Sequence, residues 1–429
     1  MIFDKFEKEV LKFSIPDSEK TIALGLSGGS DSLALMLLLR EYCKNSKINL
    51  IALTVNHHLR QESTEEAKKV SEIARKLGIS HQILDWKHDS IESNIQHQAR
   101  NARLNLLTTY CKDNKINYLF TGHTKDDVAE TFLMNMFRGS GVYGLSSIPS
   151  LTKYDSINVV RPLLNFQKDE LKNYLTSQEM IWIEDPSNKK ECYLRTKVRN
   201  LIKSQEMQKI IPEYDQLIDK LALNARNLAR ARTELESACD IKIKEIVTLH
   251  EEGYITIKHD DFLKLNEEIG LKILSSCLIT ISGHQPYKPR LYSLERLYKS
   301  LSNQKNKKTL CGCEILIKKN EIFIYRELGK TPIPLEQTSN KSWIWDHRFE
   351  ITAKNSSSIT KINALNYEDL KQFNNKKLDK IPKRIWKSLP LITTYDTKVY
   401  VPFLNSSDTE EFSIEFKPLI TLERTNFFF

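Results

Sequence analysis

The sequence lacks the features of a secreted or membrane-embedded protein. Its seven cysteines are an odd number scattered through 429 residues, which argues against a disulfide framework and for a reducing cytoplasm. The first residues, MIFDKFEKEVLKF, have no basic region followed by an apolar stretch and a cleavage site, so we expect no signal peptide. The longest apolar run, Leu33 to Leu39, is far too short to cross a bilayer. These absences predict a cytoplasmic protein with no membrane partner.

Zinc-binding patterns are missing as well. The only close cysteine pair, Cys311 and Cys313 in TLCGCEILI, lies within an expected strand, whereas zinc sites favour C-x₂₋₄-C spacing and a second ligand pair. His57 and His58 follow another expected strand, at the same sheet edge as the other ligand-binding candidates, but no carboxylate–histidine spacing accompanies them. We therefore expect no zinc site.

The chain does contain a moderate excess of positive charge. Lys and Arg number 64 against 55 Asp and Glu, which gives a net charge of +9. This excess favours an anionic partner such as nucleic acid, although it does not prove one. The length of 429 residues suits about two to three domains.

The first part of the chain alternates short apolar strands with helices. This alternation is typical of a doubly wound α/β domain, in which helices cover both faces of a parallel sheet. Strands are expected at 21–26, 48–55, 80–85 and 117–121, and helices at 31–43, 62–77, 92–113 and 125–138.

The remainder of the chain has a different pattern. From Lys168 to about Cys239 it is helical, and 253–326 combine a short strand, two helices and a hairpin that turns near Lys319-Asn320. A polar, proline-bearing stretch, LGKTPIPLEQTSNKS, predicts a linker. Short strands are then expected in WIWDHRFEI and KVYVPFL. We predict three domains, namely an α/β domain at 1–215, a mainly helical or α+β domain at 216–330 and a small α+β domain at 341–429.

The loop after the first expected strand, SGGSDS at 27–32, suits a phosphate or pyrophosphate. It leaves the carboxyl end of a parallel strand and enters a helix, which is where open α/β sheets bind ligands. Two glycines let backbone N–H groups close around an anion, and the helix N-terminus adds partial positive charge. The residues expected to bind the anion are Ser27, Gly28, Gly29, Ser30 and Ser32.

Asp31 in this loop needs a separate explanation, because a carboxylate repels phosphate. Its expected role is to hold a Mg²⁺ that bridges phosphate oxygens. The loop has neither the G-x-x-x-x-G-K-[ST] pattern of a Walker A motif nor a G-x-G-x-x-G fingerprint. The alternative is a well-capped helix start with no ligand.

The loop and several later segments resemble one enzyme family. SGGSDS is similar to the SGGxDS pyrophosphate loop of the N-type ATP pyrophosphatases (the PP-loop superfamily), which cleave ATP to AMP and pyrophosphate. TGHTKDDVAETFLMNMFRGSGVYGL at 121–145 resembles the TGHHxDDQAETFLLRLLRGSGxxGL block of the tRNA(Ile)-lysidine synthetases. Thr124 replaces the second histidine of that block and Val128 its common glutamine, so no role is carried over to them. The family's other segments are matched in order by VNHHLRQES at 55–63, ARNARL at 99–104, RPLL at 161–164, EDPSN at 184–188 and LRTKVRNLI at 194–202.

The resemblance implies a Rossmann-like PP-loop fold and a ligase that forms a carbon–nitrogen bond. ATP would adenylate the wobble cytidine of tRNA(Ile) with a CAU anticodon, and free L-lysine would then displace AMP to form lysidine. Besides the loop, Arg100 and Arg103 would bind ATP. The residues implied for lysine binding are His123, Asp127 and Glu130, which form the expected catalytic set together with Asp31.

Spacing gives the lysine-binding residues a geometric basis. On a helix that begins near Lys125, Asp127 and Glu130 are three residues apart and share a face. His123 precedes this helix at the carboxyl end of the fourth strand. The alternatives are that the carboxylates, and Asp126 with them, merely complement the positive end of the helix, and that His123 is structural.

Basic residues that suit tRNA phosphates lie farther along the chain. Arg195, Arg199 and Lys203 recur every four residues along one helical face, and Arg226 and Arg230 repeat this spacing on the next helix. Phosphate contact is the expected role, and a solvated basic face is the alternative. The two later domains, at 216–330 and 341–429, are expected to bind the tRNA. The sequence leaves the oligomeric state open, with a homodimer as one option.

Three other functions are weighed against lysidine formation. A tRNA 2-thiolase of the same ATP-using class would need sulfur-carrying cysteines, and the N-terminal half has no C-x-x-C pair. A nitrogen-transferring synthetase would need a glutaminase, and too few residues precede the loop to form one. A non-catalytic RNA-binding module would explain the charge but not the loop. An ATP–pyrophosphate exchange assay with tRNA would separate these functions.

Overall fold

The computed structural model describes residues 1–59, 62–88, 95–154, 156–184, 194–283, 289–302, 307–327, 335–336, 342–354, 359–365, 383–394, 399–401, 412–418 and 420–422. These residues divide into two compact units. Unit 1 runs from Met1 to Arg232 and unit 2 from Thr233 to Phe428. Among the described residues, no helix combines the length and the apolar character needed to cross a membrane.

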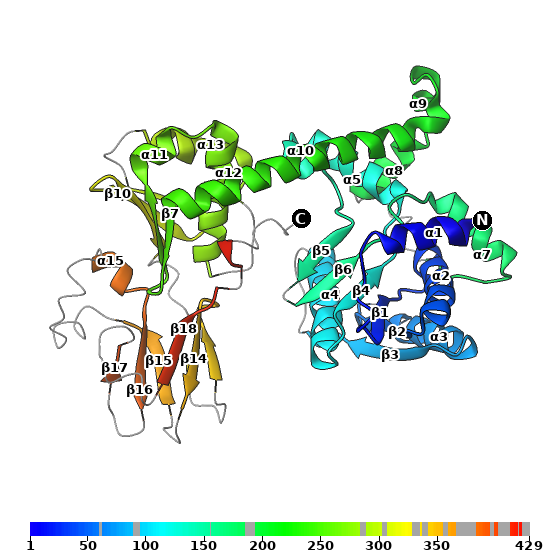
Figure 1. Cartoon of the computed structure of the whole chain (residues 1–429), viewed down its shortest axis with the longest axis horizontal. Coiled ribbons are helices and arrows are strands. Elements are labelled where there is room, and N and C mark those ends of the chain that lie inside the picture. The colour runs from blue at the N-terminus through cyan, green and yellow to red at the C-terminus, as the bar shows by residue number, and fades with distance from the viewer. Residues whose placement is uncertain are drawn as a thin grey trace. The chain divides into compact units, whose positions relative to one another are not determined.

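Unit 1 is built on a six-stranded sheet in the order β3-β2-β1-β4-β6-β5. All neighbouring strands are parallel except β5 and β6, which are antiparallel. Since β2 lies on one side of β1 and β4 on the other, the strand order reverses at β1, and open sheets bind ligands at such a point (Figure 1). The strands are β1 (Thr21–Gly25), β2 (Asn49–Asn56), β3 (Ser80–Asp85), β4 (Tyr118–Thr121), β5 (Leu151–Tyr154) and β6 (Ile157–Val160).

Helices cover both faces of this sheet. Ile22 and Leu24 of β1 pack with α2, the helix that follows this strand, on one face. Ala23, which lies between them, packs with Leu107 and Cys111 of α4 on the opposite face. The predicted doubly wound α/β fold is therefore confirmed, and its helices lie within a few residues of the expected positions. The helices of unit 1 begin with α1 (Ile2–Leu11), α2 (Ser30–Ser46), α3 (Ser63–Lys76), α4 (Ile95–Asp113), α5 (Lys125–Phe137) and α6 (Val142–Leu145).

The apolar run Leu33–Leu39 is explained by the position of α2. Every residue in that run is buried, because α2 packs against the sheet on one side and α7 on the other. The remaining helical elements are α7 (Lys168–Ser177), α8 (Leu194–Ile202), α9 (Gln205–Ile210), a 3₁₀ turn (Tyr214–Gln216) and the long α10 (Leu217–Ile246). The first part of α10 packs with α5 and α8 through a shared apolar cluster, so the core of unit 1 extends past the boundary expected at residue 215.

The described residues of unit 2 form three antiparallel sheets. One of them has five strands in the order β7-β8-β11-β10-β9. On one face of this sheet, the isoleucines of β8 and β11 pack against α12. Tyr254 and Phe323 lie on the opposite face. The predicted hairpin turn is confirmed, since Lys319 and Asn320 have φ angles of 51° and 62° between β10 and β11. The elements are β7 (Val247–His250), β8 (Tyr254–Lys258), α11 (His259–Leu263), α12 (Glu267–Ile281), α13 (Leu291–Ser300), β9 (Lys308–Leu310), β10 (Cys313–Lys318) and β11 (Glu321–Arg326).

The last part of unit 2 forms a four-stranded sheet, β12-β15-β16-β17, and a three-stranded sheet, β13-β14-β18. Within the expected linker, Leu335–Glu336 is the short strand β12, which pairs with β15. Arg326 of β11 and Arg348 both bind Asp346 in a buried ion network that joins two of the sheets. The elements are β13 (Ser342–Trp345), β14 (Phe349–Ala353), β15 (Ile359–Ala364), α15 (Lys383–Trp386), β16 (Pro390–Thr394), β17 (Val399–Tyr400) and β18 (Phe412–Phe416).

Candidate active site

The loop between β1 and α2 has a backbone that only glycine allows. Gly28 has a φ of +83°, and a Cβ built on it would lie 2.6 Å from Cγ2 of Val70. Its carbonyl accepts a hydrogen bond from the N–H of Ile183 at 2.9 Å, which ties the loop to the segment after α7. The loop conformation is thus fixed by contacts on both of its sides.

The serines of the loop are arranged around its turn. Oγ of Ser32 accepts the N–H of Ser27 at 3.2 Å and donates to the carbonyl of Gly29 at 3.0 Å. Oγ of Ser30 donates to Oδ1 of Asp31 at 3.1 Å. Because α2 begins at Ser30, the N–H groups of its first turn lie ahead of the first intrahelical bond and are available to an anion. This is the donor arrangement that the sequence predicts for pyrophosphate.

Gly122 brings the end of β4 against the start of α2. A Cβ on Gly122 would lie 3.1 Å from the backbone of Asp31 and Ser32, so a larger residue would push the two segments apart. The next residue, His123, hydrogen-bonds through Nδ1 to Oγ1 of Thr121 at 3.1 Å. The close approach places His123 and the start of α5 beside the loop.

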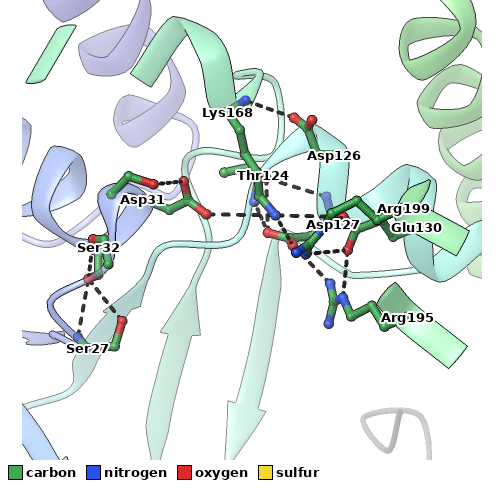
Figure 2. A network of polar contacts seen from close by, with 12 residues as sticks. Ser27, Asp31, Ser32, Thr124, Asp126, Asp127, Glu130, Lys168, Arg195 and Arg199 are labelled. Carbon is green, nitrogen blue, oxygen red and sulfur yellow. Dashed lines mark hydrogen bonds and ion pairs between the residues drawn. The ribbon is translucent and has the colours of Figure 1, made fainter. Parts of the chain in front are cut away.

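Thr124, which departs from the family pattern, caps α5. Its N–H donates to Oδ2 of Asp127 at 2.8 Å, and the N–H of Asp127 donates back to Oγ1 of Thr124 at 3.4 Å. One oxygen of Asp127 therefore holds the helix start. The other, Oδ1, faces a group of cationic side chains (Figure 2). Val128, the second departure, is buried in the apolar cluster between α5 and α8.

Lys168, at the start of α7, lies among the site's carboxylates, and sequence reasoning missed it. Its Nζ is 3.0 Å from Oδ1 of Asp127 and 3.9 Å from both Oδ2 of Asp31 and Oε1 of Glu130 (Figure 2). Its backbone N–H donates to Oδ2 of Asp126 at 2.8 Å, so Asp126 caps α7. RPLL at 161–164 marked this part of the chain, but no spacing pattern singles out the lysine four residues later.

Arg195 and Arg199 of α8 bind the same carboxylates. Arg195 donates from Nε to Oε2 of Glu130 at 2.7 Å and from a terminal nitrogen to Oδ1 of Asp127 at 2.9 Å. Arg199 donates to both oxygens of Glu130, at 2.7 and 3.2 Å. The sequence predicted phosphate contacts for this pair, whereas the structure turns both guanidinium groups toward α5. Lys203, the third member of the predicted face, is exposed.

The charges of this cluster shift the pKa values of its members. Burial raises the pKa of Asp127, but the positive charges of Lys168 and Arg195 outweigh it and hold that pKa below its usual value. Burial likewise acts on Glu130, whose pKa is lowered overall by the hydrogen bonds from Arg199 and by Lys168. Burial raises the pKa of Asp31 to about 6, against the opposing charge of Lys168. Asp127 and Glu130 are therefore both ionised at neutral pH.

His123 lies in a more positive part of the site. Burial, followed by the charge of Arg161, lowers its pKa well below the usual value, and Arg100 and Arg103 of α4 contribute in the same direction. His123 is therefore neutral at physiological pH. The two α4 arginines lie near enough to His123 to influence its pKa. Their binding of the nucleotide stays a prediction.

The loop fits the predicted magnesium ion. Mg²⁺ is commonly held by one or two carboxylates, with water and substrate phosphates completing its coordination. Asp31 supplies one carboxylate at the anion-binding loop, and it is only partly buried. Among the described residues, no group of three His, Cys, Asp or Glu side chains is spaced to hold a metal, so the remaining ligands would be phosphate and water.

The other predicted tRNA-binding residues lie on α10 of unit 1. Arg226 donates to Oδ1 of Asn165 at 2.7 Å, and Arg230 donates to Oδ1 of Asn227 at 2.8 Å. Both arginines are exposed, and each bond is to a neutral amide rather than to a carboxylate. Their positive charges thus remain available to an anionic partner.

The chain is similar to known proteins over most or all of its length. Residues 3–206 match the family described as the PP-loop domain. The tRNA(Ile)-lysidine synthase of Wolbachia pipientis wMel is 39% identical over 336 residues, which cover 77% of this chain and 76% of that protein. The tRNA(Ile)-lysidine synthase of Rickettsia felis is 33% identical over 440 residues and is matched over 100% of both chains. The chain belongs to the tRNA(Ile)-lysidine synthase family. A solved structure of the U34-tRNA thiolase NcsA from Methanococcus maripaludis is 25% identical, with a TM-score of 0.45 over 52% of this chain and 78% of that one.

Membership of the tRNA(Ile)-lysidine synthase family confirms the resemblance seen in the sequence. Family membership explains why the loop at 27–32, the block at 121–145 and the segments between them occur together in one enzyme. The roles of the individual side chains are not tested by these likenesses and stay predictions.

Proposed function

We propose that this protein joins the ε-amine of free lysine to the wobble cytidine of tRNA(Ile) with a CAU anticodon, using ATP. The observation that carries this proposal is the distance between the two halves of the site. Asp31 of the anion-binding loop and the carboxylates of α5 lie so close that a single ammonium, that of Lys168, comes within 3.9 Å of all three. A nucleotide on the loop would thus react beside a site suited to an amine.

The first step would be adenylation of the cytidine. The 2-oxygen of the cytosine ring attacks the α-phosphorus of ATP, and the bond to pyrophosphate breaks. The N–H groups and hydroxyls of the loop, residues 27–32, would bind the leaving pyrophosphate, and Arg100 and Arg103 would bind the nucleotide. Asp31 would hold Mg²⁺, which withdraws negative charge from the departing phosphates.

The second step would be attack by lysine on the activated ring carbon. The new carbon–nitrogen bond forms as the bond to the adenylate oxygen breaks, AMP leaves, and the amine loses its protons. Asp127 and Glu130 would attract the ammonium of lysine because both stay ionised. His123 is neutral and lies next to the loop, but its lowered pKa makes it a weak base, so it would orient the amine while the protons pass to water. We expect this chemistry in the cytoplasm, where tRNA, ATP and free lysine meet.

The test is pyrophosphate exchange into ATP in the presence of tRNA(Ile), first without lysine and then with it. Exchange should require this tRNA, and lysine should divert the adenylate to a nucleoside that is heavier by one lysyl group in mass spectrometry. Elongator methionine tRNA, which has the same CAU anticodon, is the matched control and should remain unmodified. Asp31→Ala should abolish exchange while leaving tRNA affinity largely intact.

Two results would count against the proposal. A sulfur-containing product would favour the tRNA 2-thiolase, which is the alternative of the same class. Exchange at the wild-type rate in Asp31→Ala would show that the metal assignment is wrong.

A further inference from the structure

We propose that the ammonium of Lys168 occupies the position that the substrate amine requires, and that bound ATP withdraws it, so that lysine binds after the nucleotide. This inference rests on the proposed function and adds an order of binding and a residue that controls it. It assigns Lys168 as a positioning residue, because it would act through the carboxylates that receive lysine.

The carboxylates expected to bind lysine already have cationic partners. Oδ2 of Asp127 is used by the cap of α5, and Oδ1 is bound by Lys168 at 3.0 Å and by Arg195 at 2.9 Å. Both oxygens of Glu130 accept hydrogen bonds from the arginines of α8. Three of these four oxygens accept two hydrogen bonds each. The fourth, Oε1 of Glu130, accepts one and lies 3.9 Å from Nζ of Lys168. An incoming ammonium would therefore compete with Lys168 at both oxygens that this ammonium approaches.

Lys168 is the cation best suited to leave. Arg195 bridges both carboxylates through two nitrogens of a rigid planar group, so moving it breaks two bonds together. Lys168 has one close hydrogen bond, and its other two carboxylate contacts are at 3.9 Å. Its ammonium is a point charge on a flexible four-carbon stem. Its backbone is fixed by Asp126, so the side chain can move while α7 stays in place.

The negative charge of the nucleotide would move the Lys168 ammonium. The Nζ atom of Lys168 is already 3.9 Å from Oδ2 of Asp31, which belongs to the loop where the phosphates would lie. ATP remains an anion after it binds one Mg²⁺, so its phosphates attract the ammonium toward the loop. The charge lost from Asp127 and Glu130 would then be restored by the ammonium of lysine. Figure 2 shows Lys168 between the loop side and the α5 side of the network.

The consequence is an ordered reaction. Without nucleotide, Lys168 competes with free lysine for Oδ1 of Asp127. With nucleotide bound, this oxygen is released and the site gains one unit of negative charge. Lysine would thus bind when ATP is in place, and its amine is needed only for the second chemical step.

The experiment measures lysine affinity by equilibrium dialysis of the full-length protein, with and without Mg²⁺ and a non-hydrolysable ATP analogue. In the wild type, the analogue should tighten lysine binding about ten- to a hundredfold, the value of one charge-assisted hydrogen bond. Lys168→Met should bind lysine tightly in both conditions, so its affinity should not depend on the nucleotide. Lys168→Arg keeps the cation and should retain a dependence on nucleotide.

Lys125→Met is the matched control. Lys125 is a neighbouring lysine that is exposed to a similar degree, 17% against 20%, but its ammonium pairs with Asp219 outside the carboxylate cluster. It should behave as the wild type. Circular dichroism and melting temperature show whether each variant is folded, and the wild-type measurement tests the proposal without any variant.

Three outcomes would overturn the inference. These are wild-type lysine affinity that does not respond to the nucleotide analogue, a response that persists in Lys168→Met, and weaker lysine binding by Lys168→Met in the absence of nucleotide. A protein that binds both substrates independently and still forms lysidine refutes the order of binding alone. A protein that binds no lysine under any condition, or leaves tRNA(Ile) unmodified, refutes the proposed function as well.

Discussion

Replacing Arg199 with methionine separates two roles that this residue can have. Its spacing with Arg195 and Lys203 predicted contact with tRNA phosphates, whereas the structure places its guanidinium on Glu130. Methionine preserves the apolar stem of the side chain and removes only the charged group. The variant should therefore damage the carboxylate cluster and leave the tRNA backbone contacts unchanged.

The expected magnitude follows from the contacts. Arg199 donates two charge-assisted hydrogen bonds to Glu130, whose side chain is only 3% exposed. Losing the partner of a buried charge costs about 3–5 kcal/mol, but Arg195 still binds one oxygen of Glu130 at 2.7 Å. We therefore expect unit 1 to lose about 1.5–3 kcal/mol of unfolding free energy, the range for hydrogen bonds to charged groups. Denaturant unfolding measures this loss.

The decisive assay is the salt dependence of tRNA binding. A lost phosphate contact lowers the slope of log K against log salt by about 0.7–0.9. Arg199→Met should leave the slope unchanged, because the guanidinium faces α5. Lys203→Met is the control. Lys203 follows directly after α8, four residues beyond Arg199, and is exposed, so its loss should lower the slope if this end of α8 meets tRNA. A drop of about 0.8 for Arg199→Met, with normal stability, would refute the inward role.

Three further predictions follow from the site. Asp127→Asn keeps an oxygen for the helix cap but loses the charge. The KM for lysine should therefore rise about ten- to a hundredfold, with little change in the KM for ATP. An equal rise in both KM values would indicate a collapsed start of α5. Glutamate at Arg226 and Arg230 should weaken tRNA binding and lower the salt slope by about 0.7–0.9 per lost contact, and an unchanged slope would place the tRNA elsewhere. Burial, followed by the charge of Arg103, lowers the pKa of His57 from 6.5 to about 4, so only the unfolded chain takes up this proton as the pH falls through that range. His57 should therefore contribute a loss of about 2 kcal/mol of stability between pH 7 and pH 5. His57→Gln should remove that part of the loss in denaturant titrations, and equal losses in both proteins would contradict it.

Much of the fold follows from local patterns in the sequence. Apolar strands such as TIALGL predict a buried parallel sheet, and the two positive φ angles at Lys319-Asn320 follow from residues that suit a tight hairpin turn. The anion-binding loop was also predictable, because glycine at position 28 and serines beside it have a direct structural meaning. These features depend on neighbours in the chain, which the sequence shows.

The orientation of α8 depends instead on a distant partner. A spacing of four residues shows that Arg195 and Arg199 share a helical face, but it does not show where that face points. The answer lies in the buried side chain of Glu130, which belongs to another helix and requires positive neighbours. Lys168 was missed for the same reason, since its partners come from α2 and α5.

The contacts also indicate different roles for Asp127 and Glu130, which the sequence alone does not distinguish. Glu130 is almost fully buried, and arginines bind both of its oxygens, so its main effect on lysine would be to hold Arg195 and to add negative charge. Asp127 has one oxygen committed to the helix cap, and its other oxygen contacts the movable ammonium of Lys168. That oxygen is therefore the acceptor that the amine of lysine would reach first. Glu130→Gln should then loosen α8 as well as lysine binding, whereas the effect of Asp127→Asn should be concentrated on lysine.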